Sequence, residues 1–230
     1  MNKNKLFLIL VALFLIVSAI GFYLLLGPAT RFRESAKYLY IPTGSNNRAY
    51  VLQQLKDSSF IRNTGLFDQL AIQMKAWNRI KPGKYKLKNG SSLLHLVRQL
   101  RNNQQEPVNL VITKLRTPQQ LAALVGKKFE CDSAAFAQYI TNSDSLRKFG
   151  VTPDEMLSIA MPETYTYYWT VRPESILQKL KKEHVRFWNG ERLQKAAESG
   201  LTPLQVSVLA SIIEEETIRH DEKPLIASVY

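Results

Sequence analysis

An unbroken apolar run stands at the start of the chain and covers residues 6–26. It contains no charged residue, and at ~1.5 Å per helical residue it extends about 30 Å, the thickness of a bilayer core. Residues 17–19 resemble a signal-peptidase site, but the apolar run continues beyond them, as a cleaved signal rarely does. The pattern therefore predicts an uncleaved transmembrane helix, preceded by a short tail at residues 1–5.

The following part of the chain alternates short apolar patterns with turn residues. We expect strands at residues 38–41, 80–87 and 108–113 and helices at residues 46–57, 64–76 and 91–102. Strands and helices in this order within so short a stretch indicate a small α+β module. Residues 27–37, which precede it, are predicted to form a linker.

The second half of the chain has mainly helical periodicity. Residues 117–146 show a helical pattern, residues 148–158 a connecting region, and residues 176–188 a basic helix whose cations we interpret as a solvent-facing surface. A later helix has a well-specified start, because Thr202 and Gln205 form the Thr-x-x-Gln pattern of a capping box around a proline. This start sets the register of the residues that follow it.

In that register a glutamate extends an apolar stripe. Leu209, Ile212, Ile213 and Glu216 recur at helical spacing, whereas Glu214 falls on a small, polar side. A carboxyl group in line with buried side chains needs partners or a bound proton. A glutamate that holds a proton is suited to protonate a glycosidic oxygen as a general acid. The alternative interpretation is a solvent-facing glutamate at the end of a helix.

Composition narrows the classes of partner and cofactor. The chain of 230 residues has 31 Lys+Arg against 19 Asp+Glu, a net charge of +12, which favours an anionic partner: nucleic acid, phospholipid head groups or a wall polymer. The basic residues are spread along the whole chain, which argues against a nucleic-acid-binding tail. One cysteine, Cys131, excludes an intramolecular disulfide, and three widely spaced histidines give no ligand spacing, so we expect no metal or other cofactor.

The charges that flank the apolar run do not decide its orientation. Lys3 and Lys5 lie on one side, and Arg31, Arg33 and Lys37 lie on the other. A very short basic tail followed by a long domain is nevertheless typical of a signal anchor. We therefore expect a single-pass protein of the cytoplasmic (inner) membrane with its N-terminus inside, which makes nucleic acid an unsuitable partner and the cell wall a suitable one.

Several motifs resemble those of one family, the endolytic murein transglycosylases. Residues 209–217, Leu-Ala-Ser-Ile-Ile-Glu-Glu-Glu-Thr, are similar to the family signature Ala-Ser-Ile-(Ile/Val)-Glu-x-Glu-Thr. Residues 221–230 fit the family's continuation, residues 161–165 resemble its Phe-Pro-(Asp/Asn)-Thr-Tyr element, and residues 187–189 and 192–193 add weaker matches. In the family the second glutamate of Glu-x-Glu is catalytic, and this position corresponds to Glu216.

The resemblance implies an α+β fold with a transmembrane helix, a small LysM-like α+β module and a mixed α/β catalytic domain. The implied divisions are a cytoplasmic tail (1–5), a transmembrane anchor (6–26), a linker (27–37), the LysM-like module (38–108) and the N-terminal part of the catalytic domain (109–230). Family members continue beyond the position of Tyr230 with an Asn-Arg-Leu element and a segment that completes the cleft. We therefore expect a truncated chain with an incomplete catalytic domain.

The implied activity is that of a lyase of the bacterial envelope. It would cleave the MurNAc–GlcNAc bond of peptidoglycan without water and leave a 1,6-anhydroMurNAc end, with Glu216 as general acid and then base. Glu214, Glu163, Tyr165 and Tyr168 are weaker candidates for substrate binding, with turn, helix-cap or strand-packing roles as the alternatives. The implied partners are peptidoglycan strands, the inner membrane and cell-wall synthases. The alternative function is a membrane-anchored peptidoglycan-binding or scaffold protein without catalysis.

Overall fold

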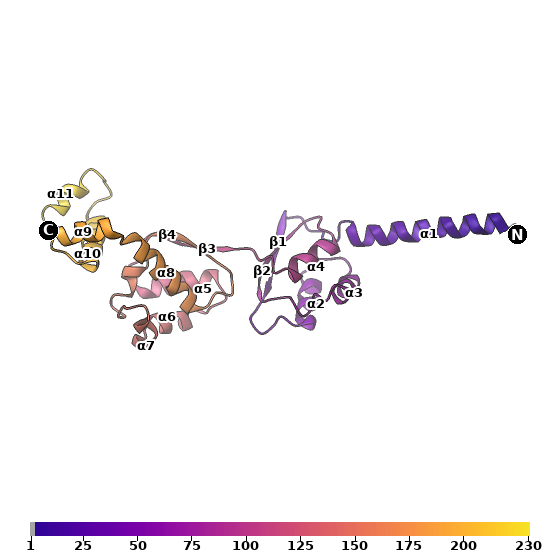
Figure 1. The fold of residues 1–230 in the computed structure, drawn as a ribbon, viewed down its shortest axis with the longest axis horizontal. Helices are drawn as coiled ribbons and strands as arrows, with labels where there is room; N and C mark the ends of the chain where they lie inside the picture. The colour runs from indigo at the N-terminus through magenta and orange to yellow at the C-terminus, as the bar shows by residue number, and fades with distance from the viewer. Residues whose placement is uncertain (1–2) are drawn as a thin grey trace. The chain divides into compact units, whose positions relative to one another are not determined.

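The computed structural model of the protein describes residues 3–230 (Figure 1). The chain forms two compact units. The first unit contains the residues up to Pro107 together with 168–170, and the second contains 108–167 and 171–230. Each unit has its own two-stranded antiparallel sheet and several helices. The α+β class expected from the sequence is confirmed, and the predicted boundary after residue 108 lies next to the boundary between the units.

Helix α1 (Lys3–Leu26) is continuous (Figure 1). Within the described residues it is the one unbroken helix that is long and apolar enough to cross a membrane, over Phe7–Leu26. Its length and composition are those of a membrane anchor or a signal sequence. Of the tail predicted at residues 1–5, the first two residues lie outside the described part of the chain, and the remainder belongs to α1.

Part of the segment predicted as a linker is built into the first unit. Thr30 is only 2% exposed. Its Oγ1 donates a hydrogen bond of 2.8 Å to the carbonyl oxygen of Lys88 and accepts one of 2.8 Å from the backbone nitrogen of Ser91. The linker expected at residues 27–37 is therefore corrected: burial and hydrogen bonding fix its first part against the loop after the second strand.

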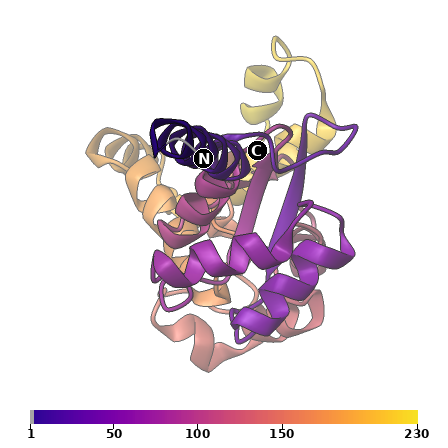
Figure 2. The same ribbon diagram turned by 90° about the vertical axis from the view of Figure 1, so that its right-hand side faces the viewer.

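The first unit is a strand pair covered by helices on one side. Its elements are β1 (Ala36–Ile41), α2 (Arg48–Asp57), α3 (Thr64–Gln73), β2 (Gly83–Lys88) and α4 (Leu93–Arg101). β1 and β2 pair antiparallel, with Leu39 opposite Tyr85. In Figures 1 and 2 the three helices lie on the same side of this pair. The strand and helix positions expected from the sequence agree with these elements to within a few residues.

The core of this unit follows from strand alternation. Leu39, Ile41, Tyr85 and Leu87 point to the helices and are at most 1% exposed. The Tyr85 hydroxyl donates to the carbonyl oxygen of Lys81 over 2.7 Å, and burial raises the pKa of Tyr85 to about 12. The residues of the Pro-Gly turn thus have a structural role, with the tyrosine in the core.

The second unit contains the remaining elements. They are β3 (Val108–Ile112), α5 (Pro118–Lys128), α6 (Ser133–Thr141), α7 (Ser143–Arg147), the 3-10 helix η1 (Met156–Ile159), β4 (Glu163–Tyr167), α8 (Pro173–Phe187), α9 (Gly190–Glu198), α10 (Pro203–Glu216) and α11 (Lys223–Ala227). β3 pairs antiparallel with β4. The helical stretch expected at residues 117–146 is three helices, because Asp132 and Asn142 each cap the start of a new one.

Helix α10 begins as predicted but is not buried as predicted. Its capping box is present, with Thr202 and Gln205 bonding to each other's backbone nitrogen. It packs against η1, α9 and α11, and none of its residues is buried. Ile212 is 37% exposed. The expected burial of the stripe that ends at Glu216 is therefore corrected, since helical spacing aligns side chains on one face but does not supply a neighbour that covers it.

Candidate functional site

The carboxyl end of α10 presents three consecutive glutamates, and two of them are ion-paired. Lys223 binds the Glu214 carboxylate. Lys114 Nζ lies 2.8 Å from Glu215 Oε1, and Arg116 Nη2 lies 2.9 Å from Glu215 Oε2. A hydrogen bond from Lys223 lowers the pKa of Glu214. Hydrogen bonds from Lys114 and then Arg116 lower the pKa of Glu215. Both carboxyl groups are therefore held in the ionised form and are poorly suited to donate a proton.

Glu216 has a different environment. It is the last residue of α10, and its side chain is exposed. Among residues 3–230 its side chain has no hydrogen-bond or ion-pair partner. Within the triplet, Glu216 is therefore the side chain to which no cation is bound.

The end of β3 connects this triplet to a second acidic candidate. Lys114 and Arg116 follow directly after β3, and both reach Glu215. In the strand register, Ile112 at the end of β3 lies opposite Glu163 at the start of β4. Glu163 is exposed and stands at the end of the sheet from which the two cations extend. The structure therefore brings this residue and the glutamate helix to the same end of the strand pair.

The two tyrosine candidates have separate positions. Tyr165 is 1% exposed, and its hydroxyl donates to the carbonyl oxygen of Met161 over 3.0 Å. Burial, with smaller effects from Glu163 and Glu183, raises the pKa of Tyr165 to about 12. The prediction that Tyr165 binds substrate is corrected, because the ring is a core side chain. Tyr168 is 55% exposed and belongs to the first unit, whereas Glu216 belongs to the second.

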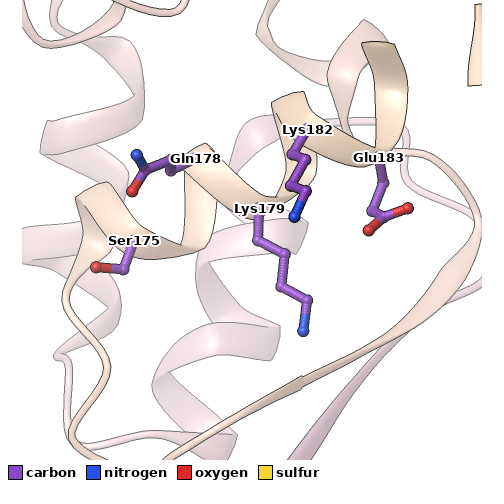
Figure 3. Close-up of a pocket in the computed structure, with 5 residues that line it drawn as sticks. All are labelled: Ser175, Gln178, Lys179, Lys182 and Glu183. Atoms are coloured by element: carbon purple, nitrogen blue, oxygen red, sulfur yellow. The ribbon is translucent and has the colours of Figure 1, made fainter. Parts of the chain in front are cut away.

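A shallow hollow of about 370 Å³ lies on one helix of the second unit. All its lining residues come from α8: Ser175, Gln178, Lys179, Lys182 and Glu183 (Figure 3). Lys179 Nζ donates to the carbonyl oxygen of Thr166 over 2.8 Å and lies 5.0 Å from the centre of the Tyr167 ring, so it ties α8 to β4. None of the site residues predicted from the sequence lines this hollow.

The cations at the glutamate helix were missed by sequence reasoning. The signal available for Lys114 and Arg116 is a Lys-x-Arg pattern directly after an expected strand, but it does not identify the carboxylate that they bind. Among residues 3–230 there is also no group of three or more His, Cys, Asp or Glu side chains placed to hold a metal ion. The expectation that no metal or cofactor takes part stays a prediction.

Comparison with known proteins gives one family match. The model of the YceG-like family matches residues 39–230. A solved crystal structure of a YceG-like protein from Listeria monocytogenes is 19% identical in sequence, with a TM-score of 0.48 over 82% of this chain and 67% of that one. A search of curated protein sequences found no match.

Proposed function

Because the chain belongs to the YceG-like family, whose members are endolytic murein transglycosylases, we propose that it cleaves peptidoglycan glycan strands with Glu216 as the catalytic residue. The observation that carries this proposal is the contrast within the glutamate triplet. Cations hold Glu214 and Glu215 as carboxylates, whereas Glu216 has no such partner in the described structure. The motif match and the local electrostatics thus favour the same side chain.

The proposed reaction uses one carboxyl group twice. Protonated Glu216 donates its proton to the oxygen between MurNAc and GlcNAc, and the bond from the muramic C1 to that oxygen breaks. The resulting carboxylate takes the proton of the muramic C6 hydroxyl while the C6 oxygen forms a bond to C1. The products are a GlcNAc hydroxyl and a 1,6-anhydroMurNAc end, and Glu216 regains its proton. No water is consumed.

Because the reaction consumes no water, a single glutamate without an ion-pair partner is sufficient to catalyse it. A hydrolytic glycosidase ordinarily needs a second carboxyl group as nucleophile or to activate water. Here the nucleophile belongs to the substrate, so Glu214 and Glu215 can remain ion-paired throughout. Because the Glu216 side chain is exposed in the structure, the bound glycan itself must displace water from around it.

The proposed location follows from α1. We assign this helix as a single-pass anchor in the inner membrane, with its N-terminus inside and both units on the outer, periplasmic side. In this arrangement the first unit corresponds to the LysM-like module and the second to the catalytic domain. Peptidoglycan is the substrate, and cell-wall synthases are candidate partners.

The exposure of α10 favours one alternative function. A membrane-anchored peptidoglycan-binding or scaffold protein without catalysis would also present a glutamate helix that has no buried residue. Such a protein would bind glycan strands but yield no cleaved products. The two functions therefore differ in product formation.

The proposed function is tested by the source of the oxygen at the new end. Glycan strands are incubated with the membrane-inserted protein in isotopically labelled water, and the products are analysed by mass spectrometry. We expect anhydro ends that resist reduction by borohydride and carry no label, because the C6 oxygen is the nucleophile. Labelled, reducible ends would show hydrolysis, and absence of new ends would favour the binding protein.

A further inference from the structure

The residues that follow α1 are tied directly to the body of the first unit. The carbonyl oxygen of Ala29 accepts a hydrogen bond of 3.3 Å from the backbone nitrogen of Arg62. Thr30 forms an antiparallel β-bridge with Ile61, and its Oγ1 donates to the carbonyl oxygen of Lys88. Two segments that are distant in the chain, the loop between α2 and α3 and the end of β2, therefore lie against the first four residues after α1.

The connection between α1 and this junction is short. Gly27 donates from its backbone nitrogen to the carbonyl oxygen of Tyr23 over 2.8 Å, and a Cβ atom at Gly27 would come within 2.4 Å of that same oxygen. From Leu26, the last residue of α1, to Thr30 the chain spans at most ~14 Å. The headgroup layer on each side of a bilayer core is about 5–8 Å thick. With α1 in a membrane, Thr30 therefore lies at the headgroup layer or just beyond it.

The alternation of the two bridged segments turns cations outward at this junction. Thr30 and Ile61 are 2% and 7% exposed, so both face the interior of the unit. Arg31 and Arg62 follow them in the chain and are exposed, because successive side chains of extended segments point to opposite sides. As diagonal neighbours across the bridge, these two arginines are ~7–8 Å apart. Lys88, at the end of β2, is also exposed. We call Arg31, Arg62 and Lys88 the junction cations.

The junction cations have no acidic partner in the part of the chain that the structure describes. None of the three forms an ion pair with a carboxylate among residues 3–230. The segments that carry them, residues 27–37, 58–63 and 88–92, contain five Arg and Lys residues against one acidic residue, Glu34. This local excess of positive charge is therefore available to an external anion.

We propose that the junction cations bind the anionic phospholipid headgroups of the bilayer that holds α1, and thereby dock the first unit on the membrane surface. This inference rests on the proposed location of the chain. Each basic residue close to an anionic membrane surface strengthens binding by a factor of about five, and the attraction extends over a Debye length of ~8 Å. Because α1 holds the cations beside the headgroups, these lipids are present at high effective concentration, which favours them over the carboxylates of a wall polymer.

The test measures how lipid charge changes the protection of the junction. The full chain is placed in nanodiscs of phosphatidylcholine, with or without added phosphatidylglycerol, and deuterium uptake is followed in peptides that cover residues 58–63 and 88–92. We expect slower uptake with phosphatidylglycerol at low salt and no difference between the two lipids at high salt. Each variant is compared with itself in the two lipids. In the combined variant Arg31→Gln and Lys88→Gln, we expect the protection by phosphatidylglycerol to fall at least about fivefold.

A matched variant separates this surface from net charge. Arg79→Gln combined with Lys81→Gln also removes one exposed arginine and one exposed lysine from the first unit. Both residues precede β2, whose length of ~17 Å separates them from Lys88, so this variant is expected to keep full protection. Equal protection in the junction variant, or uptake that does not respond to phosphatidylglycerol, would overturn the proposal. So would protection that arises only when peptidoglycan strands are added, because the cations would then bind the wall polymer.

The proposed location and this inference fail in different ways. If alkaline carbonate extracts the chain from membranes, α1 is not an anchor, and both the location and the docking surface are refuted. If the chain stays in the membrane but deuterium uptake ignores lipid charge, the location stands and the docking surface is refuted. The formation of anhydro ends is measured separately, so neither result affects the catalytic proposal for Glu216.

Discussion

Arg116 and Glu215 lie 99 positions apart in the chain and form an ion pair through two contacts, Nε to Oε1 at 3.4 Å and Nη2 to Oε2 at 2.9 Å. Lys114 adds a third contact to the same carboxylate. None of the residues of α10 is buried, and these ion pairs join the end of the helix to the segment after β3. Glu216 is the next residue in the chain, and we therefore expect its position to depend on this ion pair.

Loss of the cations should therefore reduce turnover more than substrate binding. In the variant with Lys114→Gln and Arg116→Gln we expect kcat to fall about three- to tenfold with a smaller change in KM, because exposed ion pairs are individually weak. Hydrogen exchange at the end of α10 should become faster. Arg147→Gln, which removes an exposed pair with Asp144, is the control. Unchanged exchange in α10 would contradict a positioning role.

The ionisation of Glu215 provides a second prediction. Hydrogen bonds from Lys114 and Arg116 lower its folded-state pKa, so the pair stabilises the fold above the ordinary glutamate pKa of ~4.3 and loses this effect as pH falls through the lowered value. In Lys114→Gln we expect the pKa of Glu215 to move up toward the ordinary value. NMR titration of the side-chain carboxyl carbon measures it. An identical pKa in both proteins would show that the contact is absent in solution.

The junction after α1 should contribute to stability. Thr30→Val keeps the size of a side chain that is 2% exposed but removes hydrogen bonds with Lys88 and Ser91. We expect a loss of ~1–3 kcal/mol in the free energy of unfolding of the first unit, since a buried donor and acceptor lose their partner. Denaturant unfolding followed by hydrogen exchange in β2 measures this loss. Thr152→Val, at an exposed threonine, should change little.

Tyr165 distinguishes a core role from a ligand-binding role. Tyr165→Ala removes a ring that is 1% exposed and should cost ~3–5 kcal/mol of stability, whereas Tyr165→Phe loses only the bond to Met161, about 1 kcal/mol. Thermal unfolding of the two variants gives this comparison. The glycan affinity of Tyr165→Phe should equal that of the unmodified protein. A clear loss of affinity in this folded variant would show that Tyr165 does take part in glycan binding.

Local pattern predicted much of the fold. The strands around Leu39 and Tyr85 follow from alternation, and the start of α10 follows from the Thr202 capping box, because both depend on residues close together in sequence. The break in the helical stretch at Asp132 was missed, although its side chain caps α6. For the tyrosines of β4 the sequence left sugar binding and strand packing open as alternatives, since the pairing of β4 with β3 joins distant parts of the chain.

The candidate site was less predictable, because it too depends on contacts between distant parts of the chain. Helical spacing placed Glu216 in line with Ile212 and Ile213, but whether that line is buried depends on which element lies against it. The partners of Glu215 come from the end of β3, and no local pattern links them. The sequence could therefore indicate which glutamate to test, whereas the structure supplies the contrast in ion pairing that supports the choice.

The central claim is tested most directly by the rate at which Glu216→Gln forms 1,6-anhydroMurNAc ends from peptidoglycan strands. The amide keeps the size of the side chain but can neither donate nor reclaim the proton, so we expect the rate to fall by about 100-fold or more while glycan binding persists. Glu198→Gln, an exposed glutamate on α9, serves as the control and should retain activity. Formation of anhydro ends by Glu216→Gln at the unmodified rate would contradict the account.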